Sequence, residues 1–319
     1  SRVLCTTRRP EFGHADYKVE GTNLHRRIPL DGLGSRQAPD DALEWCAALM
    51  KLPPAPTVPA PRREALIELF DRVKFHPLSI RVLAQQLKTR RAADVGERLE
   101  QLLVVPPLGG AAGEPAEAGT TNILPELRAS LELSLDKLDA AARQVLPRLG
   151  VFQGGAFEAD LVAITGLGDE AGSRAMERMP ASNGANLWPE LRRQLEAAAL
   201  IEAESIPGVG VPFLRFHPTL APMLWAQLDA AERTQWSAAH RQRYYALSGY
   251  LYHEDDRNPH QARAIAWREL PNLLHAVHAA LDASDPDAGD FAEKVNSFLG
   301  PIFGLKQEAT RLAAKAQAA

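Results

Sequence analysis

Apolar residues recur at intervals of three and four through most of the chain. In residues 123–135 this spacing places four leucines on one face of a helix: Leu124, Leu127, Leu131 and Leu135. Similar patterns predict helices over residues 39–50, 63–75, 77–88, 92–103, 139–149, 158–165, 169–179, 189–199 and 218–228. Longer helices are predicted over 230–252, over 259–284 with a break near Pro271, and over 290–318 with a break at residues 300–301.

Residues at the ends of these segments support the helical assignment. Asp139 is a good N-cap and Gly150 a good stop for the helix between them. Pro77 suits the first turn of its helix, where no amide hydrogen bond is lost. Proline and glycine in residues 52–61 and 106–121 predict loops.

Strands are predicted at few positions. Residues 3–7 form a short apolar and β-branched run, and a second short strand is expected over 23–28. Residues 200–203 and 213–217 flank a Pro-Gly turn and predict a β-hairpin. Residues 152–157 are expected to form a turn between helices. Three helices followed by a hairpin is the element order of a winged helix.

Composition limits the classes of protein that fit. Hydrophobic residues make up 45% and charged residues 24% of the 319 residues, which is ordinary for a globular protein. The net charge of -4 argues against a chain that coats DNA or an anionic membrane. Two cysteines cannot form a disulfide framework, so a reducing cytoplasm is expected. No secretory signal and no apolar run of about 20 residues is present.

Three separated segments follow the order of one protein family. Residues 2–8 (RVLCTTR) end a strand with arginine, residues 76–84 (HPLSIRVLA) start a helix with proline, and residues 216–220 (FHPTL) place histidine after the hairpin. Residues 133–138 (LSLDKL) and 149–155 (LGVFQGG) look like the winged-helix entry of bacterial members. Over residues 1–228, and less closely in the tail, the chain resembles the NB-ARC branch of the STAND signal-transduction ATPases.

The resemblance implies three nucleotide contacts. Arg8 is at the position of the sensor for the terminal phosphate, and a bidentate cation suits that role. Pro77 is at the position that packs on adenine, although residues 75–76 (FH) replace the family's Gly-Leu. His217 is at the position that contacts the β-phosphate of ADP and holds the closed state. The implied cofactor is ADP or ATP, with Mg²⁺ in the intact protein.

The family's phosphate-binding loop, G-x-x-x-x-G-K-[ST], does not occur in the sequence, and no acidic strand end precedes Arg8. We expect both in a segment before Ser1, so this chain alone is expected to be inactive as an ATPase. The implied divisions are the end of a nucleotide-binding α/β domain (1–38), a helical domain (39–122), a winged helix (123–228) and a helical, TPR-like segment (229–319).

The implied function is the regulatory part of an ADP/ATP-switched signalling protein, whose parent is a slow ATPase. It would hold ADP in a closed state and relay nucleotide exchange to domain rearrangement. Protein partners are expected on the C-terminal helices, and a homo-oligomer in the active state. Binding to nucleic acid or to a membrane is not expected.

The residues alone leave other interpretations open. Arg8 also fits a surface turn, Pro77 an ordinary helix start, and His217 a structural residue that caps a helix. A DNA-binding winged helix would use residues 189–196, where two arginines face two glutamates. A nucleotide-independent helical scaffold is a second alternative. A metal enzyme is a third, based on the spacing of His275 and His278, with His253 and His260 nearby in sequence.

Overall fold

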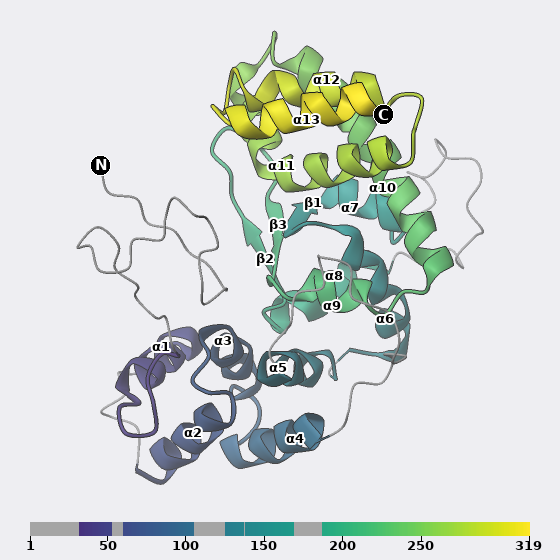
Figure 1. The fold of residues 1–319 in the computed structure, drawn as a ribbon. Helices are drawn as coiled ribbons and strands as arrows, with labels where there is room; N and C mark the ends of the chain where they lie inside the picture. Colours follow the sequence, from purple (N-terminus) through teal and green to yellow (C-terminus); the bar gives the residue numbers. More distant parts are fainter. Residues whose placement is uncertain (1–31, 53–59, 105–124, 137, 169–186) are drawn as a thin grey trace, which may run out of the picture.

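The chain forms three parts in sequence order: a group of short helices, a central unit with a small sheet, and four tail helices (Figure 1). This computed structural model describes residues 32–52, 60–104, 125–136, 138–168 and 187–319. Several predictions lie outside these ranges: the strands over 3–7 and 23–28, the loop over 106–121, the helix over 169–179 and the site residue Arg8. Within them the protein is mainly helical, as predicted, with one three-stranded antiparallel sheet.

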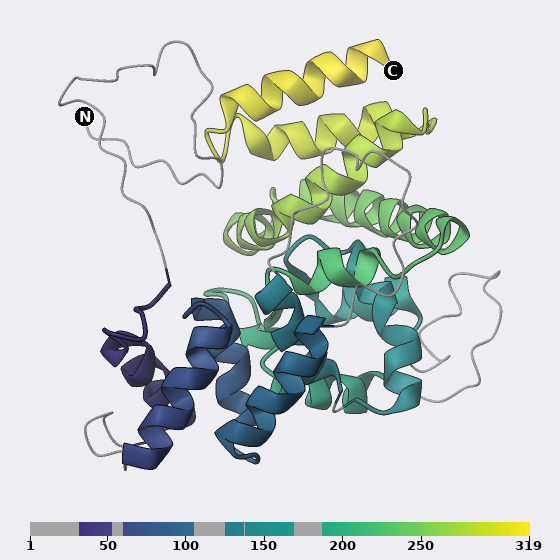
Figure 2. The same cartoon turned by 60° about the horizontal axis from the view of Figure 1, so that its bottom comes forward.

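The first part, the N-terminal helical unit, comprises α1 (Asp40–Met50), α2 (Ala60–Arg72), α3 (Pro77–Gln86) and α4 (Ala92–Val104). Figure 2 shows these helices lying side by side at one end of the molecule. Their apolar faces meet in one core, where the Phe70 and Phe75 rings pack edge-on at 6.3 Å. Each helix begins within three residues of its predicted start, because the apolar spacing marks the buried face. The loop predicted over 52–61 is wrong at its end, because α2 includes Ala60 and Pro61, and proline is tolerated in the first turn of a helix.

Helix α5 (Pro125–Leu135) belongs to two cores at once. Ala129 and Leu133 pack into the core of the N-terminal helical unit, whereas Leu131 and Leu135 pack into the core of the central unit. Residues two apart on a helix point in nearly opposite directions, so the two pairs face opposite ways. The buried Gln86 side chain on α3 also donates to the Ser134 hydroxyl at 3.2 Å. Helix α5 thus joins the first two parts.

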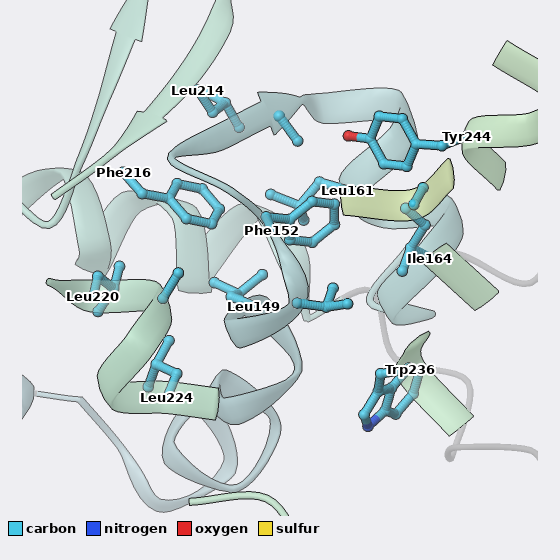
Figure 3. Close-up of a cluster of buried hydrophobic side chains, with 14 of the residues drawn as sticks. Leu149, Phe152, Leu161, Ile164, Leu214, Phe216, Leu220, Leu224, Trp236 and Tyr244 are labelled. Carbon is cyan, nitrogen blue, oxygen red and sulfur yellow. The ribbon is translucent and has the colours of Figure 1, made fainter. Parts of the chain in front are cut away.

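The central unit continues after α5 with short helices around a compact core (Figure 3). Asp139 caps the first of them by accepting from the Ala142 amide at 2.7 Å, as predicted. Gly166 ends α7 with φ of 66°, also as predicted. The helices are α6 (Ala140–Val145), the 3₁₀ segment η3 (Leu146–Val151), α7 (Glu158–Thr165), α8 (Trp188–Ala197) and α9 (Leu220–Trp225).

The sheet has the order β1-β3-β2 and contains the predicted hairpin as β2 (Ile201–Glu204) and β3 (Phe213–Phe216). Its third strand, β1 (Gly155–Phe157), corrects the prediction of a turn over residues 152–157. Gly155 has φ of 141° and lies so close to β3 that an added Cβ would be 2.2 Å from the Leu214 carbonyl oxygen. Glycine is therefore required for this strand to pair.

The tail helices are α10 (Ala230–Glu254), α11 (Pro259–Asp282), α12 (Ala288–Leu299) and α13 (Lys306–Ala318). Asp229 and Glu232 form a capping box at the start of α10. The predicted break at residues 300–301 is present, but the break near Pro271 is wrong, because α11 runs through it. The missing amide is tolerated where buried neighbours, Leu270 and Leu273, hold the helix in the core.

The core of the tail helices is continuous with that of the central unit. Burial of large apolar side chains is the main stabilising term in such a core. None of the described helices is both long and apolar enough to cross a bilayer.

Candidate functional site

Two of the three predicted site residues meet where α3 contacts the end of the hairpin. Pro77 is the first residue of α3, and His217 directly follows β3. The His217 ring lies beside the Leu78 backbone, and its pKa responds to the charges of His76 and Arg81. We call this place the junction site and define it by His76, Pro77, His217 and Thr219.

Hydrogen bonds to the hairpin and to α9 fix the position of His217. Its amide donates to the Leu200 carbonyl oxygen at 2.8 Å, which extends the pairing beyond β2 and β3. Its Nδ1 is 2.9 Å from the Thr219 hydroxyl. When that hydroxyl donates to Nδ1, the ring proton is on Nε2, which is then a donor. His217 Nε2 is buried and has no partner among the described residues.

The surroundings of His217 favour a neutral ring. Burial lowers its pKa from 6.5 to about 4, and the positive charge of Arg81 and the nearby His76 act in the same direction. The Leu78 backbone acts in the opposite direction and raises the pKa, because it favours the charged form of the ring. A buried neutral imidazole next to the Arg81 guanidinium would respond strongly to an anion.

The start of α3 supplies further polar groups. His76 is the N-cap residue, with extended backbone and no hydrogen bond from its side chain, and Pro77 follows it. The first amides of a helix have no partners within the helix, and its dipole favours an anion there. His76 Nδ1 is buried without a partner in the described part of the chain. Ser79 Oγ is also buried and unpaired among the described residues, but Ser79 is two residues from Pro77 and points to the opposite side of α3.

A row of alternating charges runs from α3 across the hairpin to α11. Arg81 Nη2 is 2.7 Å from Glu202 Oε2, and the same oxygen accepts from Arg215 Nη2 at 2.5 Å. Glu204 pairs with Arg268 on α11 and is 3.8 Å from Arg215 Nε. With three arginines and two glutamates, the row has one more positive charge than negative.

A second buried polar cluster lies where α11 contacts β1, and its groups are paired. Glu269 is fully buried and accepts from the Phe157 amide and the Tyr244 hydroxyl, both at 2.9 Å. Asn272 donates to Glu269 Oε2 at 2.7 Å and to the Gly155 carbonyl oxygen at 2.8 Å, and accepts from the Gln153 amide at 2.6 Å. We call Glu269, Asn272 and Tyr244 the α11 clamp.

The arginines of α8, which suggested a DNA-binding surface, form ion pairs within the protein. On α8, Arg192 pairs with Glu158 at 2.8 Å and Glu196 at 2.9 Å, and Arg193 pairs with Glu190 at 2.5 Å. Paired guanidinium groups make a poor phosphate-binding surface.

The histidines that suggested a metal do not form a ligand set. The His275 ring packs against His240 at 5.5 Å, and His278 Nε2 is 3.9 Å from Glu308. Across the described ranges, no group of three potential metal ligands occurs.

Sequence reasoning missed part of the junction site. Arg81 follows Pro77 by four residues, and Thr219 follows His217 by two. Helical spacing could have placed Arg81 one turn after Pro77. Glu202 could not have been found this way, because only the hairpin brings it to α3.

No known family model matches the chain, and no curated protein matches it with a significant score.

Proposed function

We propose that this chain is the regulatory part of an ADP/ATP-switched signalling protein of the STAND type. In this proposal the N-terminal helical unit is the helical domain of that architecture. The central unit, with helices before a hairpin, is its winged helix, and α10–α13 begin a TPR-like scaffold. The nucleotide-binding α/β domain would end within residues 1–38, and the phosphate-binding loop and Mg²⁺ site would lie before it.

The observation that supports this proposal best is the convergence at the junction site. Two buried polar atoms without partners in the described chain, His76 Nδ1 and His217 Nε2, belong to residues close enough for His76 to lower the pKa of His217. In native proteins the large majority of buried polar atoms are hydrogen-bonded. A cluster of unpaired ones beside a helix N-terminus is typical of a site for a polar, anionic ligand.

The residues fit the phosphates of a nucleotide. His217 Nε2 can donate to a phosphate oxygen, and a neighbouring dianion would raise the pKa of the ring. The free amides of α3 would favour the same charge. Pro77 would pack on adenine, and Arg8 would pair with the terminal phosphate.

The proposed switch depends on different affinities in two states. ADP would join the central unit to the nucleotide-binding domain through His217, and exchange for ATP would remove that preference. The parent would be a slow cytoplasmic ATPase that binds protein partners through the tail helices and forms a homo-oligomer when active. This chain alone would not hydrolyse ATP.

The test is a histidine titration of this chain by NMR, with and without pyrophosphate or ADP. We expect either ligand to raise the pKa of His217 from its free value of about 4. The signal of His260, an exposed residue on α11, is the internal control and should not move. His217→Asn should weaken binding. An unchanged His217 signal at saturating ligand would refute the proposal, and salt-sensitive binding of a DNA duplex would favour the DNA-binding alternative.

A further inference from the structure

We propose that Arg81 is a phosphate-binding residue of the junction site, and that Glu202 is the carboxylate that holds it in the absence of the anion. The inference rests on the proposed function for the class of ligand, a nucleoside polyphosphate. It adds a residue that the sequence did not single out. It also adds a link between ligand binding and the contact of α3 with the hairpin.

The first support is the position of Arg81. It follows Pro77 by four residues, so the two lie on the same face of α3, one turn apart. Its charge reaches the His217 ring, whose pKa it lowers. The Arg81 side chain is 30% exposed, so its guanidinium can move without disturbing the packing of the core.

The second support is that two arginines share the Glu202 carboxylate. Its Oε2 accepts from Arg81 and from Arg215, so one carboxylate oxygen serves two guanidinium groups. If Arg81 leaves, Glu202 keeps a partner at 2.5 Å and is not left unpaired. A phosphate has more charge than a carboxylate and binds a guanidinium through two parallel hydrogen bonds. Phosphate near the start of α3 would therefore compete well for Arg81.

The third support concerns what such competition would change. Among the described residues, Arg81–Glu202 is the one ion pair that joins α1–α4 to β2 and β3. An anion that draws Arg81 away would remove this link while leaving the shared helix α5 in place. Ligand binding would thereby loosen the contact between the N-terminal helical unit and the hairpin.

The test compares the two partners of the ion pair, using pyrophosphate as the probe and calorimetry at fixed ionic strength. Arg81→Gln removes a charge-assisted contact and should weaken pyrophosphate binding about tenfold. Glu202→Gln removes the competitor and a repulsive charge, and should strengthen binding about threefold. The double variant should resemble Arg81→Gln. A purely structural pair would give shifts in the same direction, since either change breaks the same bond.

The matched controls are Arg263→Gln and Asp255→Asn, which break an exposed ion pair of 2.7 Å in the tail and should leave binding unchanged. If Arg81→Gln does not fold, Arg81→Lys serves in its place and should weaken binding less, because it keeps the charge and loses the fork. This inference alone would be overturned if the wild type binds pyrophosphate but the Arg81 and Glu202 variants change the affinity in the same direction, or leave it unchanged. Absence of pyrophosphate binding by the wild type would overturn the proposed function with it.

Discussion

The central unit contacts its two neighbours in opposite ways. Towards the tail, the α11 clamp buries charged and polar groups that are hydrogen-bonded to one another and to β1. Towards the N-terminal helical unit, the junction site buries polar atoms that have no partners among the described residues. Both contacts are buried and polar, so burial alone does not separate a structural contact from a candidate ligand site. The clamp and the junction site differ in the pairing of their own polar atoms, although His240 Nε2, beside Tyr244, is also buried without a described partner.

The difference has an energetic meaning. A buried polar group that is satisfied contributes about 1 kcal/mol net, whereas leaving one unsatisfied costs about 1–3 kcal/mol. The α11 clamp is therefore expected to fix the tail helices on the sheet. The junction site retains a cost that a ligand could relieve, and this is why the proposed ligand site lies there.

The largest expected effect comes from removing the centre of the α11 clamp. Glu269→Ala would leave the Phe157 amide and the Tyr244 hydroxyl buried without their acceptor. We expect a loss of about 3–5 kcal/mol in the free energy of unfolding, measured by urea denaturation. Glu293→Ala, at an exposed position on α12, is the control and should change stability by less than about 0.5 kcal/mol. A loss below about 1 kcal/mol would contradict the structural role of the clamp.

A smaller effect should appear as a dependence on pH. Burial lowers the pKa of His217 to about 4 and that of His240, which packs on Tyr244, to about 3. A base with a lowered pKa stabilises the fold above its unfolded value of about 6.5, and this stability is lost as the pH falls below 6.5. At pH 5 each histidine should account for a loss of about 2 kcal/mol relative to pH 7.5.

His217→Asn and His240→Phe should each remove that part of the acid sensitivity, as measured by urea denaturation at the two pH values. Glu269 acts in the opposite sense, because burial raises its pKa to about 7 and its stability cost develops as the pH rises from 4.5. Its contribution cancels when each variant is compared with the wild type. Pyrophosphate should diminish the acid sensitivity due to His217 and leave that of His240 unchanged. Equal effects of pyrophosphate on both would argue against the distinction between the two contacts.

The smallest expected effect is at Ser79, whose buried hydroxyl has no partner in the described chain. Ser79→Ala removes a group that already bears its desolvation cost, so stability should be unchanged or higher by up to about 1 kcal/mol. The measurement is thermal unfolding of the variant beside Ser130→Ala, whose hydroxyl does donate, to the Leu127 carbonyl oxygen at 2.8 Å. Ser130→Ala should be the more destabilised of the two. The reverse order would mean that Ser79 is already satisfied.

Sequence reasoning located the elements better than it located their partners. The Asp139 cap, the Gly166 stop and the hairpin were predictable because each depends on a few neighbouring residues. Strand β1 was missed because three residues have no alternation to detect, and only pairing with β3 defines them. The helix through Pro271 was missed because tertiary packing outweighs the local penalty there.

For the candidate site, the resemblance pointed to Pro77 and His217 as ligand-facing residues, and the structure brings their segments together. Arg81 and Glu202 were not found, because their importance depends on a distance between parts far apart in the chain.

By itself, the amino-acid sequence determined most helices, some of their ends and the hairpin, since capping, turn geometry and apolar spacing act over a few residues. It did not determine where α6 ends, because the predicted stop Gly150 lies within η3. Tertiary structure decided which polar groups became paired. Asn272 of the clamp and His217 of the junction site look alike in sequence, each being a polar side chain between apolar neighbours. Whether a buried donor meets an acceptor depends on how distant segments pack, and that packing satisfied Glu269 while leaving His217 Nε2 without a described partner.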